Sequence, residues 1–208
     1  MVVEFCICNR LLTTDGNLSP DGRHINFTSR DLELAEHLRR CLRITNKIGR
    51  KSRKPDEREK KYFVVQFGDV KFYKFLMSIG FLPKKSRTLE EIKTPDKYFF
   101  DFLRGCFDGD GTFYSYWDPR WKSSYMFYTV FASASHDHID WLKNKIYKRT
   151  GAKGHITKAK MKTTFQLKYA KTESLRILSK MYYGNGTPCL SRKRLKINKS
   201  LSIIKEKI

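Results

Sequence analysis

The sequence has no hydrophobic run long enough to span a membrane, since no apolar stretch approaches the roughly 18 residues that this requires. Its N-terminal apolar stretch contains Glu4 and has no basic segment before it, which is not the pattern of a secretory signal. The sequence also lacks paired Cys-x-x-Cys motifs, and its five cysteines are an odd number, so neither a zinc knuckle nor a complete disulfide framework is indicated. We therefore expect reduced thiols, no membrane association and an intracellular location in the cytoplasm, a nucleoid or an organelle.

Acidic residues are scarce relative to basic ones. Among 208 residues there are 43 lysines and arginines against 21 aspartates and glutamates, which gives a net charge of +22. A charge of this size predicts a polyanionic partner. The basic residues occur in both halves of the chain, which favours an extended basic surface over a basic tail. Aromatic residues make up 14% of the chain, enough for a folded core. DNA-binding and structural RNA-binding proteins both fit this charge.

Residues 102–111 form the most informative segment. Apolar residues at helical spacing, among them Phe99, Leu103 and Cys106, lead directly into Asp-Gly-Asp-Gly. This pattern predicts a buried helix that ends beside Asp110. Gly105 and Gly109 lie one turn apart and have no Cβ atom, so a second backbone can approach the helix closely.

A second copy of this segment occurs near the N-terminus, at residues 11–16 (Leu-Leu-Thr-Thr-Asp-Gly). The sequence Phe-Thr-Ser at 27–29 recurs as Phe-Ala-Ser at 131–133, and the strand around Gln66 is matched by the strand around Lys168. The offset between copies grows from 95 to 102 positions, so the second copy is seven residues longer, and we place the insertion in a hairpin at 116–122. The repeat predicts two similar halves, residues 1–97 and 98–208.

With these two motif copies the chain resembles the LAGLIDADG homing endonucleases in their single-chain, two-repeat form. Residues 103–111 match the family motif well. The first copy has Arg10 in place of the family's glycine and Thr13 in place of its first acidic residue, but it keeps Asp15 and Gly16. The resemblance implies an α+β fold of two pseudosymmetric αββαββα repeats, whose antiparallel sheets form a DNA-binding saddle.

The resemblance also implies the catalytic residues. The last acidic residue of each motif, Asp15 and Asp110, would be catalytic and bind Mg²⁺ or another divalent cation such as Mn²⁺, with the carbonyls of Thr14 and Gly109 as further ligands. Hard cations prefer such oxygen ligands. The family also places polar residues near the scissile phosphates. Here the matching positions are Lys168, which would offset phosphate charge, and Gln66, which would hold water.

The strands and basic segments supply the expected DNA contacts. Ile25 and Phe27 alternate with His24, Asn26 and Thr28, so the segment predicts a strand with one apolar and one polar face. Polar residues on the outward face would read the major groove, and basic residues would lie along phosphates. The predicted DNA-binding residues are His24, Asn26, Thr28, Arg50, Lys51, Arg53, Lys158, Lys160, Lys162, Thr164 and Gln166.

Three further segments carry expectations. The dense aromatic residues 125–131 predict a well-covered sheet. His136-Asp137-His138 is compatible with a metal site, but it lacks a third ligand nearby and coincides with a helix start, so a structural or capping role is favoured. Residues 191–208 predict a lysine-rich helix that packs on the outside.

The resemblance implies a monomeric endonuclease that cuts both strands of double-stranded DNA at a long target site and leaves short 3′ overhangs. Two alternatives remain open. One is a maturase of the same fold that binds intron RNA, and the other is a DNA-binding relic that has lost catalysis. Arg10 and Thr13 favour the alternatives, whereas Asp15 and Asp110 favour cleavage.

Overall fold

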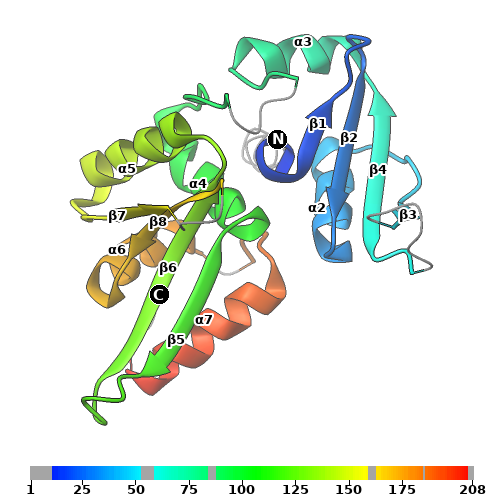
Figure 1. Cartoon of the computed structure of the whole chain (residues 1–208). Coiled ribbons are helices and arrows are strands. Elements are labelled where there is room, and N and C mark those ends of the chain that lie inside the picture. The colour runs from blue at the N-terminus through cyan, green and yellow to red at the C-terminus, as the bar shows by residue number, and fades with distance from the viewer. Residues whose placement is uncertain (1–10, 53–58, 84–87, 159–162, 185, 206–208) are drawn as a thin grey trace. The chain divides into compact units, whose positions relative to one another are not determined.

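The computed structural model describes residues 11–52, 59–83, 88–158, 163–184 and 186–205 (Figure 1). The chain divides into two compact units, one made of Met1–Lys85 and Ile92–Gly109 and the other of Ser86–Glu91 and Asp110–Ile208. Each unit contains one four-stranded antiparallel sheet. No helix in the described part of the chain is both long enough and apolar enough to cross a membrane. The boundary between sequence repeats at 97/98 stays a prediction.

The first sheet follows from the alternation of apolar and polar residues. Its strands are β1 (Gly16–Leu18), β2 (His24–Ser29), β3 (Gly49–Lys51) and β4 (Tyr62–Gly68), in the order β1-β2-β4-β3. The turn between β1 and β2 includes Gly22, whose φ of 76° suits glycine. Ile25, Phe27 and Val65 are buried on one face, so the predicted division into an apolar and a polar face is confirmed.

Helices cover the apolar face of the first sheet. The helices of this unit after the first motif are α2 (Leu32–Leu42), α3 (Val70–Ser78), the short 3₁₀ helix η2 (Asp96–Tyr98) and α4 (Phe99–Gly109). The buried residues of α2 are Leu34, Ala35 and Leu38, at the spacing of one helix face. Asp69 caps α3, because its side chain accepts a hydrogen bond of 2.9 Å from the backbone N–H of Phe72.

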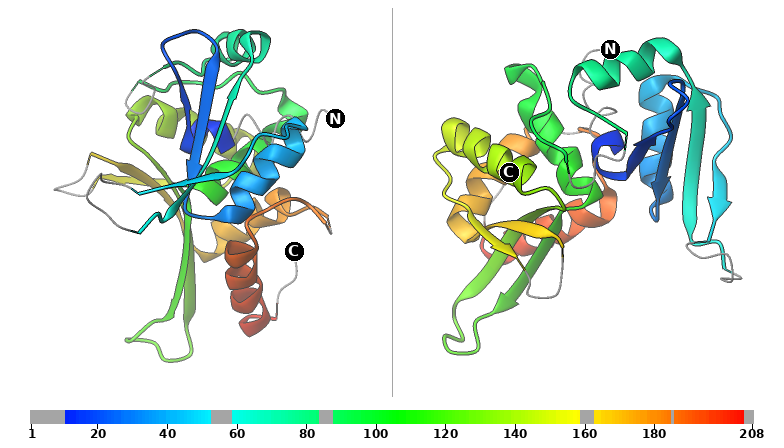
Figure 2. Two further views of the ribbon diagram at one scale, coloured as in Figure 1. Left: turned by 90° about the vertical axis from the view of Figure 1, so that its right-hand side faces the viewer. Right: turned by 45° about the horizontal axis from the view of Figure 1, so that its top comes forward.

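The second sheet repeats this plan. Its strands are β5 (Thr112–Trp117), β6 (Tyr125–Ser133), β7 (His155–Lys158) and β8 (Phe165–Tyr169), in the order β5-β6-β8-β7. Its helices are α5 (His136–Thr150), α6 (Lys171–Met181) and α7 (Ser191–Ile203) (Figure 2). Both sheets therefore have the same strand order, and the predicted α+β repeat architecture is confirmed. Residues 11–15 are helical, whereas the rest of the predicted first motif helix, including Arg10, lies outside the described residues.

The second repeat is longer at the predicted hairpin. Asn17 pairs with Asn26, nine positions away, whereas Thr112 pairs with Val130, eighteen positions away. The added residues lengthen both strands of the hairpin and not the turn alone. Part of this addition is offset further along, because β6 and β8 are separated by fewer residues than β2 and β4.

The terminal helix α7 packs one face against the second sheet and exposes the other, as expected for a helix on the outside. The packed face buries Lys193, Ile197, Ser200 and Leu201. The Ser200 hydroxyl is 3.0 Å from the Tyr125 hydroxyl, which holds α7 against the second sheet. The sequence did not indicate that one of the lysines, Lys193, lies on the buried face.

The segment His136–His138 begins α5 and has a structural role. The Ser135 side chain accepts a hydrogen bond from the backbone N–H of His138, and the His138 Nδ1 atom lies 2.7 Å from the carbonyl oxygen of Glu90. Within the described residues, no group of three or more histidine, cysteine or acidic side chains is placed to hold a metal ion. Three cysteines, Cys41, Cys106 and Cys189, lie in these ranges, and Cys106 is buried.

Candidate functional site

The helix α4 contains the second motif up to Gly109. Its residues from Phe99 to Asp108, apart from Phe100, are buried, as the apolar spacing predicted. Burial includes a charged pair, in which Arg104 donates a hydrogen bond of 2.8 Å to the carboxylate of Asp101, with both side chains almost completely inaccessible. Because isolated charges are costly to bury, this pairing is what allows charged residues to lie within the helix. The helix ends at Gly109.

The two motif copies meet at Thr14 and Gly109, which occupy matching positions in the repeat and lie in the same unit. A Cβ atom added to Gly109 would be only 2.1 Å from Oγ1 of Thr14 and 2.6 Å from its Cβ. The Thr14 hydroxyl donates a 3.2 Å hydrogen bond to the carbonyl of Leu11, which anchors the side chain in this place. The sequence analysis expected a second backbone to approach the helix at Gly105 and Gly109, and at Gly109 the approaching group is instead the side chain of Thr14.

The predicted metal ligands follow directly from this contact along the chain. Asp15 comes after Thr14, is partly exposed and precedes β1. Asp110 comes after Gly109, is exposed and precedes β5. Each carboxylate therefore stands where a helix ends and the first strand of a sheet begins. Aspartate carboxylates and a backbone carbonyl such as that of Gly109 are hard oxygen donors, which suit Mg²⁺ or Mn²⁺ and not soft metals.

A buried lysine next to Asp110 was missed by the sequence analysis. The Nζ atom of Lys193, in α7, donates a 2.7 Å hydrogen bond to the carbonyl oxygen of Gly111, and the residue is only 8% exposed. It thereby fixes the backbone directly after Asp110. The only sequence signal is that Lys193 stands four positions before Ile197 in a lysine-rich helix, which does not distinguish it from a surface lysine without knowledge of the packing.

The strand register brings Gln66 and Lys168 to equivalent positions. In the first sheet, Asn17 is opposite Asn26, and Asn26 is opposite Gln66. In the second sheet, Thr112 is opposite Val130, and Val130 is opposite Lys168. Asn17 and Thr112 each lie two positions after the motif aspartate. We call these two sets of directly opposed residues the first and second motif rows.

The motif rows alternate with the inward apolar side chains of each sheet and so lie on its outward face, where Val130 is the buried member. Gln66 is exposed and Lys168 is partly exposed. His24, Asn26 and Thr28 share the outward face of β2, and Gln166 shares that of β8, with Thr164 just before this strand. Because side chains alternate along a strand, the outward residues of each sheet can contact a ligand that lies on that sheet's open face.

The side chain of His24 is held by the carboxylate of Asp21. The Asp21 carboxylate accepts hydrogen bonds from the His24 ring Nδ1 and from the backbone N–H of His24. These bonds, with a third from the N–H of Arg23, hold the pKa of Asp21 well below its usual range. The His24 ring is therefore oriented at the end of the first hairpin by a carboxylate that stays ionised.

The basic residues of the edge strands divide between the two faces. Arg50 is opposite Phe63 with its guanidinium 5.1 Å from the ring centroid, and Lys158 is opposite Phe165 with its amine 4.9 Å from that ring. Phe63 and Phe165 alternate with the outward residues, so Arg50 and Lys158 lie on the helix-covered side, at exposed edges. Lys51 is opposite Tyr62 and faces outward. The other predicted basic contacts, Arg53, Lys160 and Lys162, lie outside the described residues.

Comparisons with known proteins support the fold and not the sequence family. No protein-family model matches the chain, and no curated protein matches it in sequence. Structures do match. The homing endonuclease I-WcaI bound to its DNA recognition sequence is 13% identical with a TM-score of 0.62, and the match covers 95% of this chain and 86% of that one. Mesophilic variants of the homing endonuclease I-DmoI give 10% identity, a TM-score of 0.59 and coverage of 94% and 97%.

The same fold occurs in a protein not described as an endonuclease. Full-length DUF199/WhiA from Thermatoga maritima is 14% identical with a TM-score of 0.58, and the match covers 98% of this chain but only 66% of WhiA. A structure of the N-terminal domain of DUF199/WhiA is described as a LAGLIDADG domain. Variants of I-DmoI were crystallised with their target DNA in the presence of manganese or magnesium. These likenesses show that the chain has the LAGLIDADG fold.

Proposed function

We propose that this chain, which has the fold of the LAGLIDADG homing endonucleases, is a site-specific endonuclease that cuts both strands of duplex DNA with a divalent metal ion. It would act as an intracellular monomer on a long target site and leave short 3′ overhangs. The observation that carries this proposal is the contact between Thr14 and Gly109, because the next residue after each is an aspartate. Because Thr14 and Gly109 are in contact, we infer that the carboxylates of Asp15 and Asp110 share a cation.

Each group has a role in the proposed reaction. Asp15, Asp110 and the Gly109 carbonyl would hold Mg²⁺ or Mn²⁺, which when bound supplies an activated water and neutralises phosphate charge. Lys168 would place a positive charge toward the scissile phosphate, where charge develops in the transition state. Gln66, at the equivalent position, would orient a water molecule through its amide. Lys193 would keep the backbone beside Asp110 in place through the Gly111 carbonyl.

DNA would lie on the outward faces of the two sheets. His24, Asn26, Thr28 and Gln166 would contact base edges, because polar side chains on a strand can reach donors and acceptors in the major groove. Lys51, which faces outward from β3, would contact a phosphate. Since affinity from phosphate contacts falls with salt, we expect binding to weaken steeply as ionic strength rises.

The proposal is tested by cleavage of a randomised duplex library, or of the uninterrupted form of the gene's insertion site, with Mg²⁺. Wild type should cut, and Asp110→Asn should bind the same DNA without cutting. Asp137→Asn is the matched control, because it makes the same change at an exposed site in the same unit and should cut normally. Tight DNA binding without cutting by wild type would refute the nuclease and leave a relic that only binds DNA.

The second candidate function is an intron RNA-binding maturase of the same fold. It is favoured by Thr13, which is buried and only 5% exposed at the position where the second motif has Asp108. The first motif thus retains one carboxylate where the second has two. Binding of structured RNA and duplex DNA at the same salt concentration separates the two functions. A preference for RNA together with absence of cleavage would support the maturase.

A further inference from the structure

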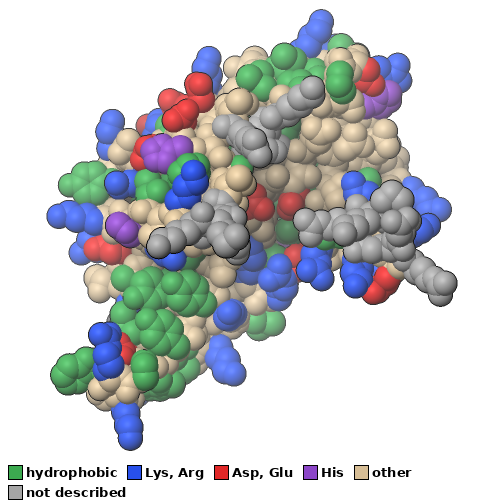
Figure 3. Space-filling view, in the orientation of Figure 1, with side chains coloured by type: hydrophobic (Ala, Val, Ile, Leu, Met, Phe, Trp, Pro, Cys, Tyr) green, Lys and Arg blue, Asp and Glu red, His purple; other side chains and the backbone are tan. Residues whose placement is uncertain are grey.

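The second sheet carries an aromatic surface that the proposed nuclease does not require. Tyr114 and Tyr128 are directly opposite each other, with ring centroids 5.2 Å apart and ring planes 16° apart. Tyr116, which lies diagonally across the hairpin from Tyr128, stacks on the same ring, with ring centroids 6.3 Å apart and ring planes 8° apart. We call these three near-parallel rings the tyrosine ladder. Figure 3 shows hydrophobic side chains gathered over β5 and β6, with basic side chains around them.

The ladder faces away from the protein core. Phe113, Phe127 and Phe131 are buried, so the alternating positions 114, 116 and 128 project from the opposite, outward face. Tyr116 is 41% exposed, and Trp121 in the adjoining turn is 67% exposed. The prediction that this aromatic segment makes a well-covered sheet is correct for the inner face and wrong for Tyr128. Exposed aromatic patches of this kind commonly mark binding sites.

We propose that the tyrosine ladder binds unpaired nucleobases, so that this sheet accepts single-stranded as well as duplex nucleic acid. The geometry favours this ligand because the rings are already parallel, and a base can extend the stack at either end. In duplex DNA the faces of the bases are covered by their neighbours, and only groove edges and thymine methyl groups are available. An unpaired base offers a free face, which stacks on aromatic side chains regardless of its identity.

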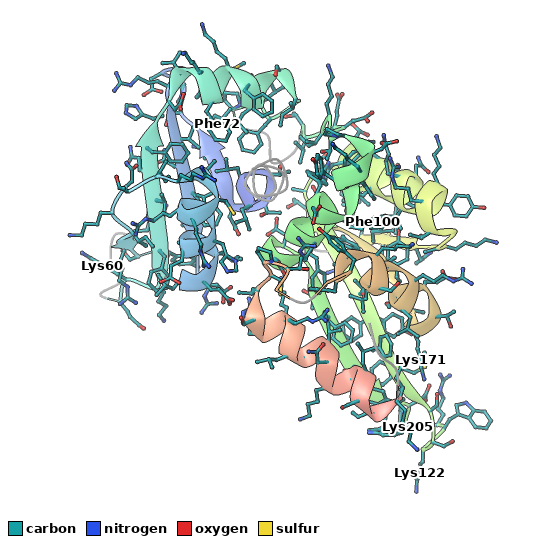
Figure 4. The ribbon with its side chains drawn as sticks, turned by 180° about the vertical axis from the view of Figure 1, so that it is seen from behind. Lys60, Phe72, Phe100, Lys122, Lys171 and Lys205 are labelled. Atoms are coloured by element: carbon teal, nitrogen blue, oxygen red, sulfur yellow. The ribbon has the colours of Figure 1, made fainter. Side chains whose placement is uncertain are left out.

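The charges around the ladder suit a phosphate backbone. Lys168 lies on the same outward face, opposite Val130 and thus diagonal to Tyr128. Figure 4 shows Lys122 at the free end of the hairpin. A strand whose bases stack on the ladder would have basic side chains toward both of its ends. Burial raises the pKa of Tyr114, and a hydrogen bond with Tyr128 raises the pKa of Tyr116, so these two rings stay neutral.

The first sheet provides an internal contrast. By the register of the motif rows, Ser19 and His24 occupy the positions of Tyr114 and Tyr128, and the Ser19 N–H donates a 3.0 Å hydrogen bond to the His24 carbonyl. The outward residues of β2 are His24, Asn26 and Thr28, which offer hydrogen-bonding groups and no stacked phenol rings. The ladder therefore depends on the side chains of the second hairpin and on its extension to Tyr116, and it does not follow from the repeat architecture.

The test measures the affinity of the full chain for labelled oligouridylate, oligothymidylate and a mixed-sequence duplex in the same buffer. The double variant Tyr116→Leu with Tyr128→Leu keeps the apolar character of the surface but removes the stacking faces. It should bind both single strands about five- to a hundredfold more weakly, with less than about a threefold change for the duplex. Tyr116→Phe with Tyr128→Phe should bind as wild type does, since the ring faces remain.

Tyr147→Leu is the matched control, because Tyr147 is 52% exposed on α5 and lies outside the ladder. It should leave all three affinities unchanged. Tighter binding of uridylate than thymidylate would identify RNA as the source of the unpaired bases, and equal binding would show that the base alone is recognised. Single-strand affinity that is unchanged in the folded leucine variant, or equally lost in the phenylalanine variant, would overturn the proposal. DNA cleavage is not part of this readout, so the nuclease and the ladder fail independently.

Discussion

The two motif rows have the same register and different chemistry. The first row runs from Asn17 through Asn26 to Gln66, three amides, whereas the second runs from Thr112 through Val130 to Lys168. The two sheets thus share the strand pairing that positions these side chains, whereas the side chains themselves differ. Identical strand pairing therefore presents neutral amides on the first sheet and a cation on the second.

The largest expected effect concerns the two motif aspartates. Asp15→Asn and Asp110→Asn should each lower double-strand cleavage at least about 10³-fold, since a shared metal site needs both carboxylates. The measurement is the conversion of supercoiled target plasmid to linear and nicked forms. If Asp15→Asn still linearised the plasmid at the wild-type rate, the degenerate first motif would be dispensable and the proposed equivalence of the two halves would be broken.

The next effect concerns the buried pair of Arg104 and Asp101, which has no charged counterpart at the matching positions Cys6 and Asn9 of the first copy. Arg104→Leu should lower the free energy of unfolding by about 3–5 kcal/mol, because it leaves a buried carboxylate without its cation. Adding Asp101→Leu should restore most of this loss. Denaturant unfolding measures both. A single variant as stable as wild type would show that the pair is not needed for α4.

A third prediction concerns Gln66 and Lys168, the last residues of the two motif rows, when each is replaced by the other's residue type. Lys168→Gln should slow single-turnover cleavage about 10²- to 10³-fold, as the loss of one group that stabilises the transition state does. Gln66→Lys should have a smaller effect, because it keeps a polar group at this position. Lys148→Gln, on the exposed side of α5, is the charge-matched control. Equal rates for Lys168→Gln and the control would remove Lys168 from the proposed mechanism.

The contact between the motif copies gives a smaller, structural effect. Gly109→Ala should destabilise the fold by about 1–3 kcal/mol, since its Cβ would overlap the Thr14 side chain. The compensating variant Gly109→Ala with Thr14→Gly should recover much of this energy, although glycine in a helix carries its own cost. Thermal unfolding of the single and double variants checks this. Additive losses would mean that the two positions do not compete for space.

The smallest effect concerns the basic residues stacked on phenylalanine rings. Arg50→Ala and Lys158→Ala should each lower stability by about 0.5–1 kcal/mol, the usual range for exposed cation–π contacts. Double-mutant cycles with Phe63→Leu and Phe165→Leu measure the coupling in each sheet. If either residue also contacts a phosphate, its alanine variant should reduce the salt dependence of DNA binding by about one counterion. Unequal coupling energies for the two pairs would show that the cation–π contact does not contribute equally at the edges of the two sheets.

The sequence was sufficient for the repeat, for both hairpins and for the end of α4. These features depend on local patterns, such as alternation in β2 and Asp-Gly after an apolar helix. The equivalence of Gln66 and Lys168 was also predictable, because aligned repeats place the same strand positions opposite each other. The roles proposed for the site residues stay predictions.

Other features depend on packing between segments distant in sequence, which local patterns do not encode. Nothing near Lys193 shows that its amine reaches Gly111, 82 positions earlier. The aromatic residues of β5 and β6 appear equally suited to a core, and only the covering helices decide that Tyr128 faces outward while Phe127 is buried. Likewise, the basic hairpins of the sequence do not reveal that Arg50 and Lys158 face the helix-covered side.

The fit of Thr14 against Gly109 also shows that the two motif copies are complementary and not interchangeable. Two identical copies would bring either two threonine side chains into this space, which would collide, or two glycines, which would leave a gap. One threonine and one glycine fill the space. A single pair of matching positions therefore makes each motif copy fit the other better than it would fit a second copy of itself.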